Sequence, residues 1–529
     1  MAKKSTRTRR GVAKKTAGKS TPKRRPARKP RAGSLPKVRV RMYRQGLGDC
    51  FLITFDVGGN ERHVMIDCGT LGATTTGVKL ADAVADIREV TGGHLHVLIA
   101  THEHWDHVAA FDQLQTEFEE MTIDHVWLAW TEDPADALAQ KVAKTKKDLG
   151  AALAEAASAL TSPAASPDSK AMGEAVASVL GFFDDGSLGA GKFSKTVDRA
   201  MEFVRSGVGK KVRYCRPGDD PFEESWLPGF RVFVLGPPRS EEALYNLGEH
   251  GSSELYSLAA GLRPAARLFA RGQPARVLQA RDSTERREFT AEVPFDVRFR
   301  READAEATRE MFGGTYLAAG TEWRRVDEDW LHVASDLALQ LDSATNNTSL
   351  ALAIERVADG KVLLFPADAQ QGSWLSWHDA KLQWKVTDGS ATRTVRVADL
   401  LARTVFYKVG HHSSHNATAR GKGLELMEQE NELTAFIPVD RAVALERNPK
   451  GSWKMPALAL YRRLLEKCQG RVVRSDVGWA ADPATAANKA TEKAFAKMAT
   501  AAEWKKWGKA QKAATHVTIG KKFVDFVLE

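Results

Sequence analysis

Apolar and polar positions alternate through residues 38–70, VRVRMYRQGLGDCFLITFDVGGNERHVMIDCGT. A two-residue period is typical of half-buried strands, and the turn sequences GLGD and GGN divide this stretch into two or three of them. Helical spacing follows in KLADAVADIREV, an apolar run in HLHVLIA, and helical spacing again in HVAAFDQLQTEF. The order of strands, helix, strand and helix predicts an α/β domain built in layers.

The pattern changes near residue 133, where an Ala-rich stretch carries Lys and Glu at helical spacing. Strand patterns return in FRVFVLGPP, SLALAIERVADGKVLLFPAD, TVFYKVGHH and GRVVRSD, whereas an irregular, Arg-rich stretch precedes residue 335 and helical patterns dominate beyond residue 455. We therefore expect one domain at 36–480 with insertions at about 133–225 and 240–340. A helical extension is predicted at 481–529.

The composition is that of a globular protein, because 529 residues with 43% apolar content can bury a large core. The chain has no run of about 18 apolar residues and no apolar segment behind its basic start, so we expect neither a membrane span nor a secretory signal. Its four cysteines lack CxxC spacing, which argues against a disulfide framework or a zinc ribbon. These features predict a cytoplasmic protein with no membrane partner.

The positive charge is concentrated at one end of the chain. Residues 1–33 hold 14 Lys and Arg and no acid, so the tail carries more than the whole net charge of +10 and the remainder is slightly acidic. This composition predicts a disordered basic tail at 1–35 that can bind polyanions such as nucleic acid. The same tail could equally be a solubilising arm without a partner.

Candidate chemistry is densest in THEHWDHVAA at residues 101–110, directly after the apolar run HLHVLIA. On an extended turn leaving a strand, His102 and His104 can point the same way, and the start of the next helix can present Asp106 and His107 to a second point. Imidazole and carboxylate ligands together suit Zn²⁺, Mn²⁺ or Fe²⁺. The pattern therefore predicts a site for two divalent cations. The alternative is a polar helix start, with Asp106 near the positive end of the helix dipole and the histidines on the surface.

The pattern of His102, His104, Asp106 and His107 resembles the HxHxDH motif of the metallo-β-lactamase superfamily. The blocks RQGLGDCFLI, NNTSLALAI, LLFPAD and VFYKVGHHSS are similar to those of the soluble hydrolase domain of the ComEC/Rec2 competence proteins. This resemblance implies a four-layer αββα sandwich with helical insertions. It also implies a metal-dependent hydrolase in which a hydroxide bound by two divalent ions, Zn or Mn, attacks the substrate.

Matched positions extend the implied site. Asp67 would orient a metal-binding imidazole, Asp106 and Asp368 would orient the attacking hydroxide, and Asp368 would bridge the two metals. Of the pair His411–His412, one would bind the second metal and the other would face the substrate as a catalytic residue; we favour His412 as the ligand. Substrate contacts are expected from Ser413, Ser414, His415 and Trp105.

The chain departs from the family pattern in one ligand. Many members place a further histidine on the strand that corresponds to VFVLGPP, where this sequence has Gly236 or Pro237. The first metal site is therefore expected to be more open or weaker. Asp49 in GLGD and the pair Asn346–Asn347 belong to the matched blocks, although each could simply be a turn or strand-start residue that satisfies its own backbone.

Three functions remain open at this level. A phosphodiesterase or nuclease acting on nucleic acid or nucleotides agrees with the ComEC-like blocks and the basic tail. A hydrolase of small esters, lactams or thioesters would use the same metals beneath a pocket roofed by the insertions. A non-catalytic scaffold would keep structural metals and bind a protein partner through its helical insertions. A bacterial source would fit the first function by analogy.

Overall fold

The computed structural model describes residues 35–161, 167–184, 195–245, 306–315, 318, 320–321, 329–447, 453–480 and 492–529. The predicted basic tail, apart from its last residue, and residues 246–305 of the second predicted insertion lie outside these ranges. No helix within the described ranges is both long enough and apolar enough to cross a membrane.

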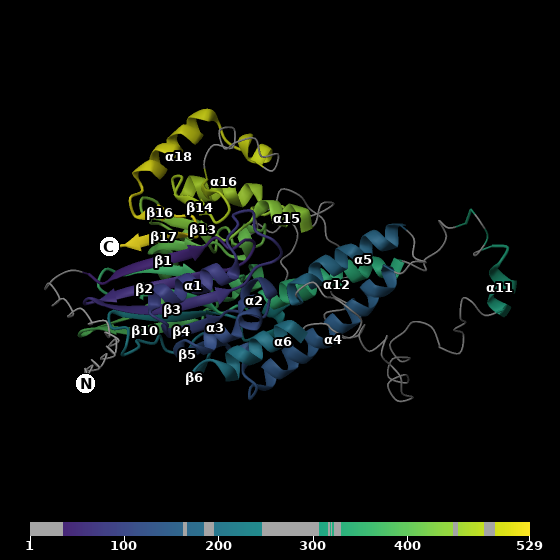
Figure 1. Ribbon diagram of the computed structural model, residues 1–529, viewed down its shortest axis with the longest axis horizontal. Helices are drawn as coiled ribbons and strands as arrows, with labels where there is room; N and C mark the ends of the chain where they lie inside the picture. Colours follow the sequence, from purple (N-terminus) through teal and green to yellow (C-terminus); the bar gives the residue numbers. More distant parts are fainter. Residues whose placement is uncertain are drawn as a thin grey trace, which may run out of the picture.

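Two large sheets form the centre of the fold (Figure 1). The first sheet has eight strands in the order β16-β17-β1-β2-β3-β4-β5-β6. Their bounds in chain order are β1 Lys37–Tyr43, β2 Cys50–Val57, β3 Asn60–Cys68, β4 His94–Ala100, β5 Thr122–Ala129, β6 Lys211–Cys215, β16 Val517–Ile519 and β17 Phe523–Leu528.

The second sheet has seven strands in the order β15-β14-β13-β12-β9-β8-β7. These are β7 Phe230–Gly236, β8 Ala351–Arg356, β9 Lys361–Phe365, β12 Thr404–Lys408, β13 Thr434–Ile437, β14 Val472–Arg474 and β15 Gly478–Trp479. A separate antiparallel hairpin pairs β10 (Gln383–Asp388) with β11 (Ala391–Arg396).

The two sheets pack face to face over an apolar core. Alternate residues of both sheets meet in one cluster, with Val40, Ile53 and Ile99 from the first sheet and Ile354 and Phe406 from the second. Aromatic rings cross the interface, for example Phe51 against Phe365 and Phe406 against Phe526, whose centroids lie 6.3 and 5.0 Å apart. Burial of this area is the main stabilising term of the sandwich.

Helices cover the outer faces. On the first sheet, α1 (Leu80–Thr91) buries Val84 and Ile87 in the same cluster as Leu98 of β4. On the second sheet, α16 (Leu458–Lys467) buries Leu464 in that cluster together with Val472 of β14. This arrangement of helix, sheet, sheet and helix confirms the predicted α/β sandwich.

Most predicted elements are present. The stretch 38–70 forms β1, β2 and β3; KLADAVADIREV forms α1; HLHVLIA forms β4; and the four later strand patterns form β7, β8 with β9, β12 and β14. The helical pattern after the HxHxDH motif is divided at Leu114 into α2 (Trp105–Gln113) and α3 (Gln115–Glu119).

The predicted helical extension at 481–529 contains helices but also two strands, β16 and β17, which follow them. After α17 (Lys493–Ala496) and α18 (Ala501–Ala513), β16 and β17 join the first sheet, and β17 pairs antiparallel with β1 in the register Val38↔Leu528. The alternating segment FVDFVL carries that strand pattern. The C-terminus therefore completes the first sheet.

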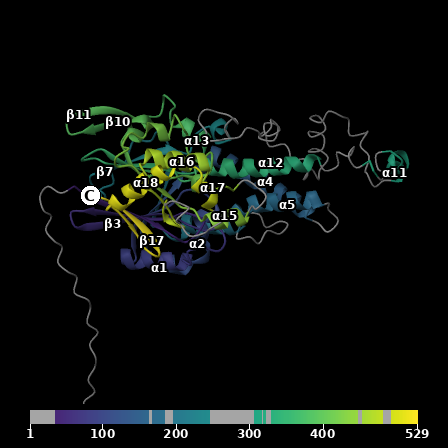
Figure 2. The same cartoon turned by 90° about the horizontal axis from the view of Figure 1, so that it is seen from above.

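The first insertion is helical over most of its length but also contributes β6, which pairs in parallel with β5. Its helices are α4 (Ala137–Leu160), α5 (Pro167–Leu180), the short η2 (Gly181–Phe183), α6 (Lys195–Glu202) and the single turn η3 (Phe203–Gly207). Figures 1 and 2 show α4 and α5 beside α12 (Asp329–Asn346) in a bundle that projects from one end of the sheets, and α11 (Glu306–Phe312) lies beyond it.

The other short helices of the described ranges are η1 (Trp130–Glu132), α7 (Glu241–Leu244), α13 (Gln371–Ser376), α14 (Val397–Ala402), η6 (His411–Ser413), η7 (Leu424–Leu426) and α15 (Arg441–Arg447).

The carboxyl ends of parallel strands set the position of the polar residues. In the first sheet β3 runs parallel to β4, and in the second β9 runs parallel to β12. Parallel strands end at the same edge of a sheet, so the loops that follow them are neighbours. Asp67, the HxHxDH motif, Asp368 and His411–His412 all lie at the ends of these four strands.

Close backbone contact at this edge gives a first testable prediction. A Cβ on Gly69 would overlap the backbone of Asp106 and His107, and Asp49 N–H donates to the Asp106 carbonyl nearby at 3.0 Å. We expect Gly69→Ala to lower the free energy of unfolding by about 3 kcal/mol or more, the upper end of the usual cost of overpacking.

The matched control is Gly508→Ala in α18, where an added Cβ meets no atom within 4 Å among the described residues. That variant should be neutral or slightly more stable, because Ala favours helix. Chemical denaturation measures both. Equal stabilities for the two variants would contradict the close approach.

Candidate metal centre

Residues in the left-handed backbone region gather around the strand ends. Asp67, Ala367, His411, His412 and Ser413 have φ angles of 54°, 52°, 41°, 49° and 64°. Such angles are uncommon for residues with a Cβ and cost free energy that the surrounding structure must supply. Their concentration at one edge marks this edge as the place where the fold tolerates strain to aim side chains.

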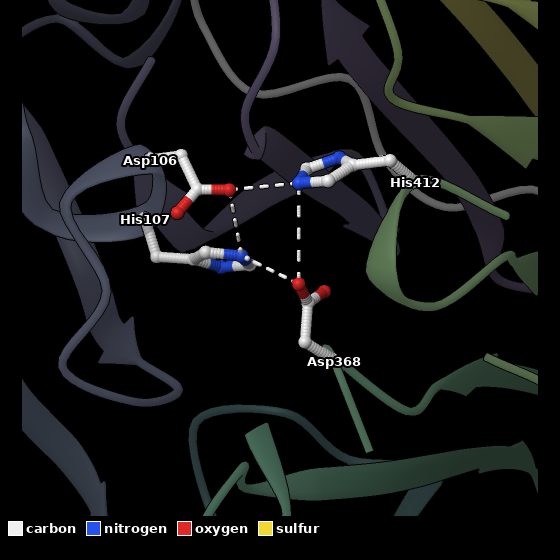
Figure 3. A group of neighbouring side chains, drawn as sticks. All are labelled: Asp106, His107, Asp368 and His412. Carbon is white, nitrogen blue, oxygen red and sulfur yellow. Dashed lines mark hydrogen bonds and ion pairs between the residues drawn. The ribbon is translucent and has the colours of Figure 1, made fainter. Parts of the chain in front are cut away.

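Four side chains from the two sheets converge at this edge (Figure 3): Asp106 and His107 from the start of α2, Asp368 after β9, and His412 after β12. His412 Nε2 lies 2.7 Å from Asp106 Oδ2, and His107 Nε2 lies 3.2 Å from Asp368 Oδ2. His107 Nε2 is also 3.7 Å from Asp106 Oδ2. One ligand atom from each residue lies within 4.8 Å of the others, and all four residues are buried.

The outward nitrogens of these imidazoles are held by acceptors. His107 Nδ1 lies 2.8 Å from Asp67 Oδ2, and His412 Nδ1 lies 2.6 Å from the Pro438 carbonyl. Asp67 is itself fixed by the backbone and hydroxyl of Thr101, which donate at 2.8 and 2.7 Å. With Nδ1–H donating outward, each Nε2 is directed at the centre, where its lone pair can bind a metal once the Nε2 proton has left.

Asp368 divides its two oxygens between different partners. Oδ2 faces the imidazoles, whereas Oδ1 accepts from the His411 N–H at 2.9 Å and from Lys408 Nζ at 3.1 Å. Lys408 Nζ also lies 2.5 Å from Asp49 Oδ2 and donates to the Ala367 carbonyl. Lys408 is therefore a fixed positive charge beneath the centre, and Asp49 is its second partner.

His102 and His104 form a neighbouring pair. His102 Nε2 lies 3.1 Å from His104 Nδ1, and the His102 ring lies 4.2 Å from the His107 ring. Neither joins a group of three or more His, Cys, Asp or Glu ligand atoms within the described part of the chain. The strand end that would carry a third histidine supplies Gly236, which lies against Ser373 and Trp377. Among the described residues, the predicted first metal site thus has the two imidazoles of the motif, and the strand end at Gly236 adds none.

Charges within the centre separate its imidazoles into two classes. Burial opposes protonation of His107 and His412, but Asp368 and Asp106 near both rings outweigh burial and raise their pKa values above the usual range. Burial instead lowers the pKa of His102 well below its usual range, and that of His104 to about 3.

The same neighbouring charges shift the pKa values of the carboxyl groups. Burial raises the pKa of Asp368, but Lys408 and His107 outweigh it and hold that pKa well below its usual range. At Asp106, His107 and His412 likewise outweigh burial and lower the pKa. At Asp342 of α12, burial together with Asp106 and Asp368 outweighs the opposing effect of His412 and raises the pKa well above the usual range.

The pattern of unsatisfied atoms is suited to a cation. Among the described residues, buried atoms without a hydrogen-bond partner include Asp49 Oδ1, His104 Nε2, Asp106 Oδ1, His107 Nε2 and Asp342 Oδ1. Buried polar atoms normally have hydrogen-bond partners, so a group of buried atoms without one is suited to bind a water or an ion. Imidazole nitrogens and carboxylate oxygens together suit Zn²⁺ and Mn²⁺. The donor set fits a divalent metal at Asp106, His107, Asp368 and His412.

The other predicted residues have varied positions. His411 points away from the cluster, because its Nδ1 meets Ser414 Oγ at 2.9 Å and its Nε2 faces Asn346 Nδ2. Burial lowers its pKa to about 4, so this imidazole is neutral near pH 7. Ser413 Oγ is buried without a hydrogen-bond partner among the described residues, whereas His415 is exposed.

Trp105 does not have the environment predicted for it. The residue is 4% exposed and packs in an apolar cluster with residues of α1 and the first sheet, as a core residue does, and its expected substrate contact stays a prediction. Its position just inside α2, next to Val108 and Ala109 of the same cluster, accounts for this.

Sequence reasoning missed two residues of the centre. Lys408 was read as part of the apolar strand TVFYKV, although a lone lysine in a buried strand signals a required charge. Asp342 lies between the second predicted insertion, at about 240–340, and the block NNTSLALAI, outside every matched block. Asp49, for which a turn role was equally open, makes a buried ion pair with Lys408 at 2.5 Å.

Comparison with known families agrees with this geometry. Residues 43–126 match the metallo-beta-lactamase superfamily, a segment that runs from the end of β1 into β5 and contains the HxHxDH motif. Proteins of this superfamily are generally hydrolases that bind divalent metals, often zinc. No curated protein matches the chain.

The buried charge of Lys408 gives a second prediction. Removing one partner from a buried ion pair leaves an uncompensated charge and usually costs about 3–5 kcal/mol. We expect Lys408→Met to destabilise metal-free protein by this amount, since Asp49 and Asp368 both lose their cation. Urea denaturation in the presence of EDTA measures the effect.

A double variant controls for lost packing. Adding Asp49→Asn to Lys408→Met removes one of the two stranded carboxylates, so the pair of changes should cost clearly less than the sum of the single changes. Strict additivity would show that Lys408 does not act through its contact with Asp49.

The raised pKa values of His107 and His412 give a third prediction. Above about pH 6.5, the ordinary histidine value, these imidazoles keep protons in the folded metal-free protein that they lose on unfolding. Folding stability therefore declines as pH rises from about 6.5 through the folded pKa values, by up to about 1.4 kcal/mol per pH unit for each imidazole. Denaturation in EDTA between pH 6.5 and 8.5 measures the slope.

His412→Gln should reduce this slope, because one of the two proton-binding imidazoles is lost. The control is His63→Gln, since burial lowers the pKa of His63 to about 4 and that ring is neutral throughout the range. A stability that is flat in the wild type, or a slope changed equally by both variants, would contradict the proton assignment.

Proposed function

We propose that this chain is a metal-dependent phosphodiesterase or nuclease that acts on nucleic acid or nucleotides. The carrying observation is the buried convergence of Asp106, His107, Asp368 and His412 from the strand ends of both sheets. The match of residues 43–126 to a superfamily of metal-dependent hydrolases supports hydrolysis as the reaction class. The phosphodiester substrate rests on the similarity of four sequence blocks to the ComEC/Rec2 domain and on the basic tail.

The residues that would hold divalent cations, Zn²⁺ or Mn²⁺, fall into two halves. His102 and His104 would hold one cation, and Asp106, His107, Asp368 and His412 would hold the other. When bound, the cations supply a lower pKa for water and positive charge beside a phosphate oxygen.

The protein groups have separable duties in this proposal. Asp106 Oδ1, which lacks a hydrogen-bond partner among the described residues, can accept a hydrogen bond from water and orient it. Lys408 and the His411 N–H hold one oxygen of Asp368 so that the other stays directed at the imidazoles. Asp67 fixes the ring of His107. His411 is neutral near pH 7, and it would form a hydrogen bond to a leaving group only after its ring turns from Ser414 and Asn346.

A second candidate is favoured by one observation, the depth of the centre. His102, His104, Asp106, His107, Asp368 and His412 are each at most 1% exposed. A small ester, lactam or thioester reaches such a buried site more easily than a nucleic-acid strand does. The two candidates differ in the role of the basic tail, which only a polyanionic substrate would use.

Metal content and hydrolysis test the reaction class. We expect about two cations per chain by ICP-MS and hydrolysis of bis-p-nitrophenyl phosphate and of DNA. Asp106→Ala/Asp368→Ala should lower hydrolysis by about 10³-fold or more, since the metals contribute several kcal/mol to the barrier. The exposed Asp220→Ala is the matched control and should keep full activity.

Three outcomes separate the candidates. Cleavage of p-nitrophenyl esters or a chromogenic lactam without phosphodiester cleavage would favour the second candidate. Metals without any hydrolysis would indicate a scaffold that binds partners through its insertions. Metal-free, inactive wild-type protein would contradict the metal-dependent function.

Salt dependence tests the polyanionic substrate. DNA affinity should fall steeply between 50 and about 200 mM salt, because bound Lys and Arg release counterions from the backbone. Removing residues 1–33, which carry 14 Lys and Arg, should reduce the slope of log affinity against log salt. An unchanged slope would show that the tail does not contact the substrate.

A further inference from the structure

The imidazoles of the centre follow a common rule: one ring nitrogen meets an outward hydrogen-bonding group, and the other faces the centre. Asp67 receives His107 Nδ1, the Pro438 carbonyl receives His412 Nδ1, and Thr101 Oγ1 lies 3.1 Å from His102 Nδ1. In each case the inward nitrogen is Nε2. The outward contact fixes both the tautomer and the ring angle.

His104 is aimed the other way around. Its Nδ1 is the nitrogen that meets His102 Nε2 at 3.1 Å, so its outward nitrogen is Nε2. That Nε2 is buried and has no hydrogen-bond partner in the described ranges. Following the rule of its neighbours, His104 requires an acceptor on its Nε2 side.

Asp342 of α12 is the group that lies there. Asp342 Oδ1 is 3.8 Å from His104 Nε2 and is itself buried without a hydrogen-bond partner among the described residues. The separation is shorter than the span of about 4.5 Å that a bridging water needs with ordinary hydrogen-bond lengths and angles. A small rotation of the carboxyl or the ring therefore closes a direct contact between two atoms that otherwise stay unsatisfied.

The surroundings hold both groups in place. Asn346, one turn further along α12, donates from Nδ2 to Asp342 Oδ2 at 3.1 Å, which leaves Oδ1 for His104. The His104 ring is packed against Phe182 and Phe183 of η2, with centroids 5.4 and 4.8 Å away. The first insertion, through η2, and helix α12 thus both contribute to the environment of a single imidazole of the motif.

We propose that Asp342 is a positioning residue of the first metal half-site, which accepts a hydrogen bond from His104 Nε2–H and thereby directs the Nδ1 lone pair toward the point shared with His102 Nε2. This inference rests on the proposed metal-dependent function and adds a residue that orients a ligand where the strand end at Gly236 supplies no histidine. The insertion helix α12 becomes part of the metal centre, where a residue outside the matched family segment orients a ligand.

The geometry favours orientation over direct ligation. Asp342 approaches the Nε2 side of the His104 ring, whereas the nitrogen beside His102 is Nδ1. Asp342 also forms no group of three ligand atoms with His102 and His104 among the described residues. A carboxyl group on the far nitrogen acts through the imidazole, as Asp67 does for His107.

Cobalt and zinc binding test the inference without reliance on turnover. Wild-type protein titrated with Co²⁺ should show two binding steps with separate visible absorption. Asp342→Ala should keep the step that belongs to Asp106, His107, Asp368 and His412. Its other step should weaken by about 10- to 100-fold, the usual effect of losing a group that orients a metal ligand. ICP-MS after gel filtration should then fall from about two zinc ions per chain to about one.

Two variants separate orientation from folding. Asp342→Asn keeps an oxygen that can accept a hydrogen bond from His104 Nε2–H. The cobalt affinity of the step that weakens in Asp342→Ala should therefore stay within a few-fold of wild type in Asp342→Asn. Gln340→Ala on the same helix is the matched control and should bind as wild type does. Thermal melting of the metal-free variants checks that each is folded.

Distinct results would overturn the inference and the proposed function. Two unchanged cobalt steps in Asp342→Ala would contradict the role of Asp342 while leaving the metal centre intact. Equal loss of both steps in Asp342→Ala and Asp342→Asn would show that the residue supports the fold and does not orient His104. Wild-type protein that binds neither Co²⁺ nor Zn²⁺ would contradict the proposed function itself and remove the basis for this inference.

Discussion

The balance of charge at one buried edge is the constraint on which the structure depends. Asp49, Asp67, Asp106, Asp342 and Asp368 are all buried where the two sheets meet. Lys408 is a fixed positive charge in contact with two of them, Asp49 and Asp368. The pKa values of His107 and His412 are raised only because neighbouring carboxyl groups outweigh the effect of burial. Buried carboxylates without cations are costly, so this edge is stable when positive charge is brought to it. A divalent metal at the imidazoles would supply that charge and satisfy the orphaned atoms together.

The same edge explains why the fold has this form. Parallel strands in both sheets end there, which brings side chains separated by about three hundred positions, such as Asp106 and His412, within 2.7 Å. The apolar core between the sheets fixes their relative position, and the left-handed residues at the strand ends give the side chains their final direction. The insertions then close the centre from outside, through Phe182, Phe183 and Asp342.

Alternation and helical spacing report burial directly, so they predicted the layered α/β domain, and the family resemblance implied the sandwich and the strand-end site. They could not predict contacts that depend on distant segments. The C-terminal strand FVDFVL carries the right pattern but finds its partner β1 almost five hundred residues away, and Trp105 within the motif turns into the core. Lys408 and Asp342 were missed since a single charge in an apolar strand or in an insertion helix has no spacing signal. Of the pair His411–His412, only the folded backbone distinguishes which ring faces Asp106.

Anomalous diffraction from crystals of protein loaded with Zn²⁺ or Mn²⁺, recorded on both sides of the metal absorption edge, tests the central claim most directly. The account predicts one strong peak among Asp106, His107, Asp368 and His412, and a second between His102 Nε2 and His104 Nδ1. Crystals of loaded protein with no anomalous peak at these residues would contradict it.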